Sequence, residues 1–416
     1  MTICIFEDQQ YQKLLPLCYG RPVYELKVGA FTLLERILNV YPKAKFSLQS
    51  RPYLANSLKQ RYGDLSINKL RNDDYLFING SIIADSKLPN KVKEKGANCC
   101  YLKGKDLIAA RLDKEAVAKI DMKRDLAEQL RKLPKKKIAI NRIEYLWDLL
   151  GWHQQLLAED INNLLKGKKP ATRYREGVFV VNSKKVFIDR NCDIKPGAVL
   201  DASEGPIYIE EGVTIGANSV LTGPVYIGYD SIINPLARID HHTYIGPLCK
   251  IGGEVGKSII QSYSNKQHDG HLGHAYIGSW CNLGADSTNS DMKNNYSSVK
   301  VWTNGQMQDS KQTFVGLFMA DHGKSGIGTL FNTGTVVGFS SNVVGAAVTP
   351  KAVPSFGWIN LEGQSQEYDL TKAIKTAEAA MKRRKQKMTP ALRRLFKEIF
   401  QLSQAERKQL LPKINK

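Results

Sequence analysis

The amino-acid sequence predicts a mixed α/β domain, then a parallel β-helix, then a helical C-terminal segment. Three observations predict this order. Strand-like apolar runs alternate with helical spacings over residues 1–165, apolar residues then recur every six positions within 178–353, and residues 354–416 are basic with helical periodicity. A period of six matches neither a helix nor a simple strand, and it is the repeat of a parallel β-helix.

The first 165 residues carry the signals of buried strands and amphipathic helices. Thr2–Phe6 and Tyr75–Asn79 are short apolar runs and are expected to be strands. Helical spacing predicts helices at Leu33–Val40, at 107–133 and at Leu146–Leu165. A linker rich in lysine, glycine and proline is expected next, at residues 166–177.

The six-residue repeat predicts a coil over residues 178–353. Its apolar positions fall six apart without a slip at Ile209, Ile215, Leu221, Ile227, Ile233, Ile239, Ile245 and Ile251. Three hexapeptides make one turn of a prism, and each inward side chain stacks about 4.8 Å above its equivalent. Gly and Asn suit the corners, where positive φ is often required. An insertion is expected at Asp291–Gln312, and the flat sides of such a rod favour a symmetric trimer.

The C-terminal tail, residues 354–416, is expected to hold two basic amphipathic helices, at Glu367–Lys385 and Pro390–Phe400. A solenoid needs a cap at its open end, and these helices are suited to that role. A membrane-surface role is the alternative. It is less favoured, because the helices lack the wide apolar face rich in Trp and Phe that such anchors use.

The composition is that of a globular protein with an excess of positive charge. Among 416 residues, 60 Lys and Arg against 40 Asp and Glu give a net charge of +20, with clusters at 131–137 and 382–394. Such runs are usually solvated, although they also suit nucleic acid, a membrane surface or small anions. No nucleic-acid-binding motif accompanies them, so no nucleic-acid partner is expected.

Two further features bear on location. No apolar run approaches the roughly 18–20 residues of a membrane span, and the N-terminus enters a strand pattern directly, so neither a span nor a signal peptide is expected. The seven cysteines are odd in number, scattered and never spaced C-x-x-C, which favours reduced thiols in a cytoplasmic protein.

A histidine-rich segment, Ser264–His274, interrupts the repeat and is expected to project as a loop. It carries His268, His271 and His274, and an imidazole of near-neutral pKa suits a general base. Two alternatives stay open. The three histidines could meet on one zinc ion, although Cys and carboxylate partners at metal-like spacing are absent, or they could be ordinary polar residues.

The motifs around this segment resemble those of a known enzyme family. Asn-Lys-Gln-His at 265–268 and Ile-Gly-x-x-x-Asn-Leu-Gly-Ala at 277–285 resemble the acetyltransferase half of the bifunctional N-acetylglucosamine-1-phosphate uridylyltransferase / glucosamine-1-phosphate N-acetyltransferase family. Residues 14–17, 21–22 and 32–36 are similar to a variant with a shortened N-terminal domain. The resemblance covers nearly the full length. It implies a nucleotidyltransferase-like α/β domain followed by a left-handed β-helix.

The resemblance also assigns roles to residues in the coil. His268 falls on the catalytic base, which takes a proton as the substrate amine attacks the thioester carbonyl of acetyl-CoA. Asn282 falls on a residue that helps to bind or orient the amino sugar, and Asn265, a candidate for substrate binding, falls on the first residue of the family's Asn-Lys pair. Lys266 follows in the Asn-Lys pair and is expected to face the sugar phosphate, and Ala285 falls where a backbone group meets the acyl donor.

Three departures from the family pattern lie near these positions. His271, a candidate for substrate binding, stands where the family usually has Tyr, and Asp291-Met292 stand where it has Asn-Tyr. Leu317 replaces a small hydroxyl residue near the CoA. Acyl transfer is still expected, but the identities of the amino sugar and the acyl group stay open.

The N-terminal domain departs further from the family. Nucleotidyltransferases hold a nucleoside triphosphate with a Gly-rich loop, cations and Mg²⁺ bound to Asp, and this chain has no such loop after its first strand. Arg21 and Lys27 are the expected phosphate contacts, although Arg21 could instead pair with Glu25 and fix the loop. Asn79 stands where the metal-binding Asp is expected, which leaves Asp85 as the metal candidate.

These features together predict a cytoplasmic, multifunctional transferase of nucleotide sugar synthesis. The β-helix would acetylate a sugar-phosphate amine from acetyl-CoA, and the N-terminal domain would transfer a nucleotidyl group from a nucleoside triphosphate with Mg²⁺. Two alternatives remain. The N-terminal domain could be only a sugar-nucleotide-binding or assembly module on an acyltransferase, or the coil could be purely structural.

Overall fold

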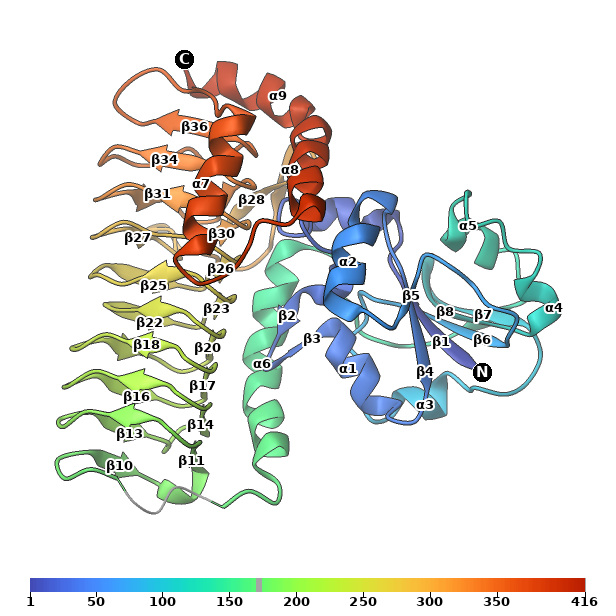
Figure 1. Ribbon diagram of the computed structural model, residues 1–416, viewed down its shortest axis with the longest axis horizontal. Helices are drawn as coiled ribbons and strands as arrows, with labels where there is room; N and C mark the ends of the chain where they lie inside the picture. The colour runs from blue at the N-terminus through green and yellow to red at the C-terminus, as the bar shows by residue number, and fades with distance from the viewer. Residues whose placement is uncertain (170–173, 416) are drawn as a thin grey trace. The chain divides into compact units, whose positions relative to one another are not determined.

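The structure, a computed structural model, describes residues 1–169 and 174–415. Its contacts divide the chain into two compact units (Figure 1). The first comprises Met1–Leu26 and Phe31–Tyr145, and the second comprises Lys27–Ala30 and the chain from Leu146 onward. The helix at Leu146–Leu165, expected from its sequence to belong to the N-terminal domain, is instead grouped with the β-helix. Of the predicted linker, residues 170–173 lie outside the described residues.

The first unit is built on one seven-stranded sheet of order β5-β4-β1-β6-β8-β7-β9. The strands β5, β4, β1 and β6 are parallel, and β8 runs antiparallel to β6 and β7. The strands are β1 Thr2–Phe6, β4 Lys45–Gln49, β5 Ser66–Ile67, β6 Tyr75–Asn79, β7 Cys99–Lys103, β8 Asp106–Leu112 and β9 Lys135–Lys137. The helices are α1 Leu33–Val40, α2 Ala55–Tyr62, α3 Leu88–Lys91, α4 Lys114–Val117 and α5 Leu126–Leu130.

Local sequence explains most of this unit. The predicted strands β1 and β6 and the predicted helix α1 have the expected bounds, and a capping box between Thr32 and Glu35 begins α1. The prediction of one helix over residues 107–133 is wrong. Its first part is the strand β8, which is buried beside β6, and the short helices α4 and α5 follow. Pairing within the sheet overrides the helical propensity of this segment.

The second unit is a parallel β-helix with three faces, each a stack of short parallel strands (Figure 1). Face one contains β10 Phe179–Val181, β13 Val199–Asp201, β16 Val220–Thr222, β19 Arg238–Ile239, β22 Glu254–Gly256, β25 His271–Gly273, β27 Thr288–Asn289 and β32 Leu330–Phe331. Face two contains β11 Val186–Ile188, β14 Ile207–Ile209, β17 Val225–Ile227, β20 Thr243–Ile245, β23 Ile259–Ile260, β26 Tyr276–Ile277, β30 Phe318–Met319, β33 Val336–Val337 and β35 Ala352–Val353. Face three contains β12 Asp193–Ile194, β15 Thr214–Ile215, β18 Ile232–Ile233, β21 Lys250–Ile251, β24 Asn265–Lys266, β31 Lys324–Ser325, β34 Asn342–Val344 and β36 Gly357–Asn360.

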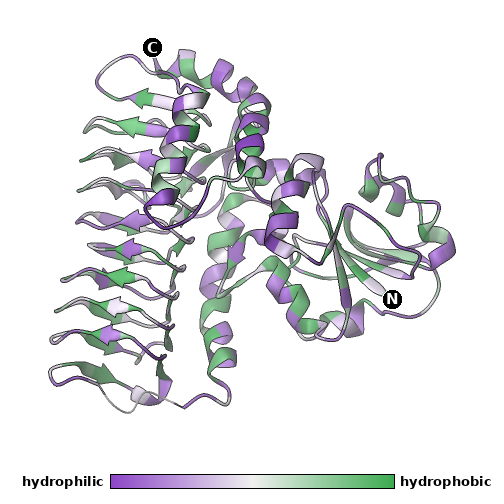
Figure 2. Cartoon of the chain, in the orientation of Figure 1, coloured by the Kyte–Doolittle hydropathy of each residue, from purple (hydrophilic) through white to green (hydrophobic). Residues whose placement is uncertain are grey.

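Apolar columns run through the centre of this coil and confirm the predicted repeat. On face two, Ile209 pairs with Ile227, which pairs with Ile245, and all three are fully buried. Figure 2 shows hydrophobic residues recurring along the strands of the coil. Several corners hold non-glycine residues at positive φ six positions apart, such as Asp230, Leu236, His242 and Leu248. The six-residue period therefore places both the inward apolar side chains and the corner residues with positive φ at regular intervals.

The histidine-rich segment does not project as a loop, contrary to the expectation from sequence. Asn265–Lys266 forms β24 and His271–Gly273 forms β25, each paired in parallel with the strand one turn earlier. The change of register is absorbed by a shorter turn, since Ile245 pairs with Ile260, fifteen residues on, and not eighteen. The insertion predicted at Asp291–Gln312 contains a hairpin of β28 Lys300–Thr303 and β29 Gln306–Asp309.

Helices cover one side and one end of the coil. The helix α6 Leu146–Leu165 packs on β17 of face two, and α7 Leu370–Lys382 and α8 Pro390–Leu402 follow β36 near their predicted positions. The coil continues past residue 353 to β36. A third helix, α9 Gln404–Ile414, was not predicted, and its Leu411 and Ile414 pack against the core of the coil. In the described part of the chain, no helix is long and apolar enough to cross a membrane.

Candidate functional site

A ladder of polar side chains on face three forms the base of the candidate site. Lys250 pairs with Asn265, Asn265 with Asn282, and Asn282 with Lys324, so the four occupy equivalent positions on successive turns. Strand pairing spaces such neighbours about 4.8 Å apart. Side chains alternate along a strand, so while the next residue in each strand points into the core, these four point outward.

A pocket of about 600 Å³ lies over this ladder and gathers the principal candidates. His268, Asn265, Asn282 and Ala285 all line it. The volume falls in the range of small-molecule sites. Of the residues assigned by resemblance to acyl transfer, the structure therefore brings together the base, both asparagines and the position expected to meet the acyl donor.

The pocket is strongly basic. Five cationic or titratable basic side chains line it, and no carboxylate among the described residues does so; the five are Lys250, His268, Lys324, Arg383 and Arg384. Burial lowers the pKa of the Lys324 ammonium, whose Nζ donates to the carbonyl of His322 (3.0 Å). This charge favours a phosphorylated ligand, because arginine and lysine donors recognise phosphate oxygens.

The segment after α7 closes over the two asparagines. Arg384 Nη2 donates to Asn265 Oδ1 (2.8 Å), and Asn265 Nδ2 donates to Asn282 Oδ1 (3.2 Å). The three side chains form a hydrogen-bonded chain that begins in the C-terminal tail and ends on the coil. The tail therefore contributes directly to the pocket, as well as capping the coil.

Two stacked aromatic rings form another wall. The rings of Tyr263 and Trp280 lie parallel, with centroids 4.1 Å apart and planes 5° apart, and His322 continues the stack 6.2 Å from Trp280. Tyr263, Trp280 and His322 all occupy corners with positive φ. A flat aromatic surface beside basic groups suits a ligand with a planar or apolar part joined to phosphate.

Three candidates from sequence lie outside the pocket. Lys266 takes an inward position and its ammonium group is enclosed by backbone carbonyls, so it does not face a sugar phosphate. Leu317 is fully buried in the core of the coil, which excludes contact with a bound CoA at this position. His271 lies on face one, in β25, paired with Glu254.

The three clustered histidines do not converge on one point. His271 Nδ1 lies 3.1 Å from Glu254 Oε1 and its Nε2 lies 3.7 Å from Asp291 Oδ2, while His274 Nδ1 lies 2.7 Å from that same Asp291 oxygen. His268 lines the pocket of face three. Residues 1–169 and 174–415 hold no group of three His, Cys, Asp or Glu side chains placed to bind a metal.

His271 and Asp291 shift each other's pKa values in opposite directions, and both shifts favour the charged forms. The Asp291 carboxylate raises the pKa of His271, against the effect of burial. Burial alone would raise the pKa of Asp291, but hydrogen bonds from His271 and His274 hold it well below its usual value. These side chains form a local hydrogen-bonded network at Asp291, where the insertion begins.

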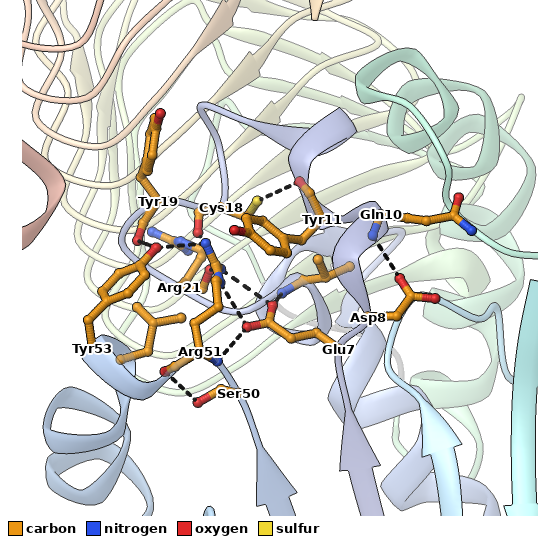
Figure 3. A network of polar contacts seen from close by, with 12 residues as sticks. Glu7, Asp8, Gln10, Tyr11, Cys18, Tyr19, Arg21, Ser50, Arg51 and Tyr53 are labelled. Atoms are coloured by element: carbon orange, nitrogen blue, oxygen red, sulfur yellow. Dashed lines mark hydrogen bonds and ion pairs between the residues drawn. The ribbon is translucent and has the colours of Figure 1, made fainter. Parts of the chain in front are cut away.

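In the first unit, the loop after β1 is held by a buried ion pair (Figure 3). Arg51 Nε lies 2.8 Å from Glu7 Oε1, and the guanidinium also donates to the carbonyls of Cys18 (2.7 Å) and Arg21 (2.8 Å). Its Nη1 donates to the hydroxyl of Tyr53 (2.7 Å). Figure 3 shows these groups meeting around the Arg51 guanidinium.

The end of β6 is equally crowded. Asn79, at the position of the expected metal-binding Asp, donates to Asp8 Oδ2 (2.9 Å) and to the carbonyl of Leu107 (2.9 Å). Its side-chain Oδ1 accepts hydrogen bonds from the backbone N–H and the hydroxyl of Ser81. The cavity beside Asp8 and Asn79 measures only about 10 Å³. That volume is about one water molecule, far below a nucleotide site.

A larger cavity of about 460 Å³ lies nearby, lined by Asp8, Asp106, Asp125 and Glu128 together with Lys105 and Arg131. Arg142 bridges two of these carboxylates, with Nη1 3.2 Å from Asp106 and Nη2 3.9 Å from Asp8. The acidic excess makes this cavity a poor receptor for a bare triphosphate.

The remaining N-terminal candidates are placed as follows. Lys27 belongs to the second unit, where its Nζ donates to the carbonyl of Ala30 (3.2 Å) and lies 5.0 Å from the ring of Tyr244. Asp85 is exposed and accepts a hydrogen bond from the backbone of Lys87 (2.9 Å). The Arg21 carbonyl is held by Arg51, and Glu25 pairs with Arg61 (2.9 Å).

Several pocket residues were not found from sequence: Lys250, Tyr263, Trp280, Lys324, Arg383 and Arg384. A signal existed for the two lysines. Each directly precedes an inward position of face three, as Asn265 and Asn282 do, so the coil register alone could have selected them. The two arginines come from the tail, and nothing in the local sequence shows where the tail folds back.

Comparisons with known proteins support the division into a nucleotidyltransferase-like domain and a β-helix with acyltransferase motifs. Residues 3–169 match the family model described as sugar nucleotidyl transferase. The bifunctional protein GlmU of Methanocaldococcus jannaschii is 25% identical over 377 residues, which cover 79% of this chain and 89% of that protein. GlmU of Nitrosospira multiformis is 22% identical over 187 residues, covering 39% of this chain and 40% of that protein. These matches confirm the resemblance predicted from sequence.

The extent of the matches varies. The chain spans 40% or less of the length of the first three curated relatives that it matches. A crystal structure of UDP-N-acetylglucosamine acyltransferase aligns with a TM-score of 0.29 and 15% identity, covering 44% of this chain and 69% of that one. The β-helix is established by the strand pairing described above.

Proposed function

We propose that this chain, a relative of the bifunctional GlmU proteins that carries a sugar nucleotidyl transferase domain, acetylates the amine of a sugar phosphate with acetyl-CoA in the face-three pocket. One observation carries the proposal: His268, Asn265 and Asn282 line a single pocket together with a cluster of basic groups. The His268 imidazole suits the amine of the substrate, the two asparagine amides suit the sugar, and the basic side chains suit the phosphate.

The chemistry follows from these positions. The free amine of the sugar attacks the carbonyl carbon of the thioester, and the C–N bond forms. The His268 imidazole accepts the proton that the amine loses, which is general base catalysis. The C–S bond then breaks and the thiolate leaves with its electron pair and is protonated. The products are an amide and the free thiol of CoA, and the basic wall binds phosphate throughout.

The direct test is product analysis. Purified protein is incubated with acetyl-CoA and a panel of 1-phosphorylated and unphosphorylated amino sugars, and mass spectrometry follows the gain of one acetyl group. Acetylation of phosphorylated acceptors in preference to unphosphorylated ones is expected. Absence of acetylation across the panel would contradict the proposal.

For the first unit we propose nucleotidyl transfer to a sugar 1-phosphate, supported by the family model over residues 3–169. Mg²⁺ is the cation such chemistry uses, and the carboxylates present do not fit it as arranged. Asp8 and Asp106 are engaged by Gln10 and Arg142, and Asp8 also by Asn79.

A second candidate for this unit is a binding or assembly module. Two features favour the module: the Arg51–Glu7 clamp, which is the buried ion pair that holds the loop after β1, and the cavity of only about 10 Å³ at the end of β1 and β6. Incubation with UTP or dTTP, sugar 1-phosphates and Mg²⁺ separates the two. Pyrophosphate release supports nucleotidyl transfer. Its absence with every pair, in a preparation that still acetylates, supports the module.

A cytoplasmic location and a homotrimer complete the proposal. The free cysteines favour a reducing compartment. The coil exposes large apolar side chains, including Leu236 (76%) and Val348 (60%), which favours contact between copies of the coil.

A further inference from the structure

The turn that carries His268 is held from inside the coil by a buried lysine. Lys266 occupies an inward position of face three, directly in register with Ile215, Ile233 and Ile251 on earlier turns. Its exposed fraction is only 2%. An amine is costly to bury without partners, so a lysine in an apolar column points to a specific role.

The partners of Lys266 are backbone carbonyls, and two of the three lie on the His268 turn. Its Nζ donates to the carbonyls of His268 (2.7 Å), Asp269 (3.3 Å) and Gly252 (3.0 Å). An ammonium group has three donors, so all three are used. Burial lowers the pKa of Lys266 to about 8, which leaves the ammonium form in place at neutral pH.

The same turn is held from a second direction. Asn234 lies two turns of the coil before Gln267, and its Nδ2 donates to the carbonyl of Gln267 (2.7 Å). Gly252 and Gly253 let the turn approach closely, since a Cβ on Gly252 would lie 2.3 Å from the Gln267 carbonyl oxygen, and one on Gly253 would lie 2.8 Å from that of His268. Three consecutive carbonyls, of residues 267–269, are thus fixed.

We propose that Lys266, assisted by Asn234, is a positioning residue for His268: its enclosed ammonium group fixes the backbone of the turn that presents the imidazole to the pocket. The inference rests on the proposed role of His268. Lys266 acts on the carbonyl side of the turn and touches no ligand. It therefore acts on the rate of the chemical step and not on the binding of phosphate.

The test compares kcat and KM for acetyl transfer in Lys266→Met and Asn234→Ala. A misplacement of about 1 Å in a catalytic group can cost about 100-fold. We expect kcat to fall about 10- to 100-fold in Lys266→Met and about 3- to 10-fold in Asn234→Ala, with both KM values within about 3-fold of wild type. Val343→Ala, in the same column of face three, controls for a simple core defect and keeps the wild-type kcat.

The outcomes distinguish a positioning role of Lys266 from phosphate binding by Lys266. A rise in acceptor KM with unchanged kcat in Lys266→Met would overturn the positioning role and restore phosphate binding. If Lys266→Met does not fold, as judged by circular dichroism, Asn234→Ala decides, and a wild-type kcat there overturns the inference. If His268→Ala itself retains full acetylation, the proposed function fails, whereas an inactive His268→Ala beside a fully active Lys266→Met defeats only this inference.

Discussion

At the scale of single residues, a buried ion pair holds the loop after β1 in the first unit. Arg51 and Glu7 are an enclosed pair, with side chains 9% and 3% exposed, and the guanidinium also holds two loop carbonyls. Burial would lower the pKa of Arg51, but the charge of Glu7 raises it above its ordinary value, so the guanidinium stays charged. Removing one member of such a pair leaves the other buried alone.

The Arg51 pair yields a stability prediction. Arg51→Met should destabilise the first unit by about 3–5 kcal/mol, because Glu7 is then left as a buried charge. Adding Glu7→Gln should recover part of the loss. Hydrogen exchange of β1 and β4 measures the change. The exposed pair Arg190–Glu211 of the coil is the control, and Arg190→Ala should change the stability of the chain very little. Equal effects in the two pairs would contradict the clamp.

The Asp291 cluster yields a pH prediction. A raised His271 pKa contributes stability that is complete below the ordinary value near 6.5 and is lost as pH rises through the raised value. The lowered Asp291 pKa contributes stability that is present above the ordinary value near 3.8 and is lost as pH falls. His271→Gln should therefore lower the unfolding midpoint most below the ordinary histidine pKa near 6.5, and progressively less as pH rises through the raised pKa of His271. His241→Gln is the control, and a loss independent of pH would refute the assignment.

At the scale of elements, the C-terminal tail changes the pocket. Arg384 follows α7 and reaches Asn265, so it contributes both charge and order to the site. Hydrogen bonds to charged groups contribute about 1.5–3 kcal/mol. Arg384→Ala should therefore raise the KM of at least one phosphorylated substrate about 10-fold or more, with a small effect on kcat. Arg393→Ala, which breaks an exposed pair with Glu378 in the same tail, should leave both constants unchanged.

The elements also show what sequence can and cannot predict. The columns of Ile209 and Ile215 follow from a fixed period, so the coil and the insertion at 291–312 were predictable. The place of His268 in a pocket followed from its motif. The inward position of Lys266 did not, because the turn before it is three residues short and its register depends on pairing between strands. The first part of the segment 107–133 is a strand and not a helix because it pairs with the neighbouring strand β6, which the local sequence does not show.

At the scale of the whole molecule, exposed apolar corners bear on assembly. Leu236 is 76% exposed and lies at φ 64°, a conformation that leucine adopts unfavourably and Asp more readily. Leu236→Asp should therefore preserve the folded chain while weakening a trimer. Analytical ultracentrifugation is expected to show a trimer for wild type and smaller species for the variant. A monomeric wild type would contradict the proposed assembly.

In the proposed function, the face-three pocket performs acetyl transfer and His268 acts as its base. The most direct measurement is thiol release from acetyl-CoA, in the presence of an amino-sugar phosphate, by wild type, His268→Ala and His271→Ala. General base catalysis contributes about 10²- to 10⁴-fold. The rate should fall by about that factor in His268→Ala and stay within about 3-fold of wild type in His271→Ala, which lies outside the pocket on face one. An undiminished rate in His268→Ala, or a larger loss in His271→Ala, would contradict the account.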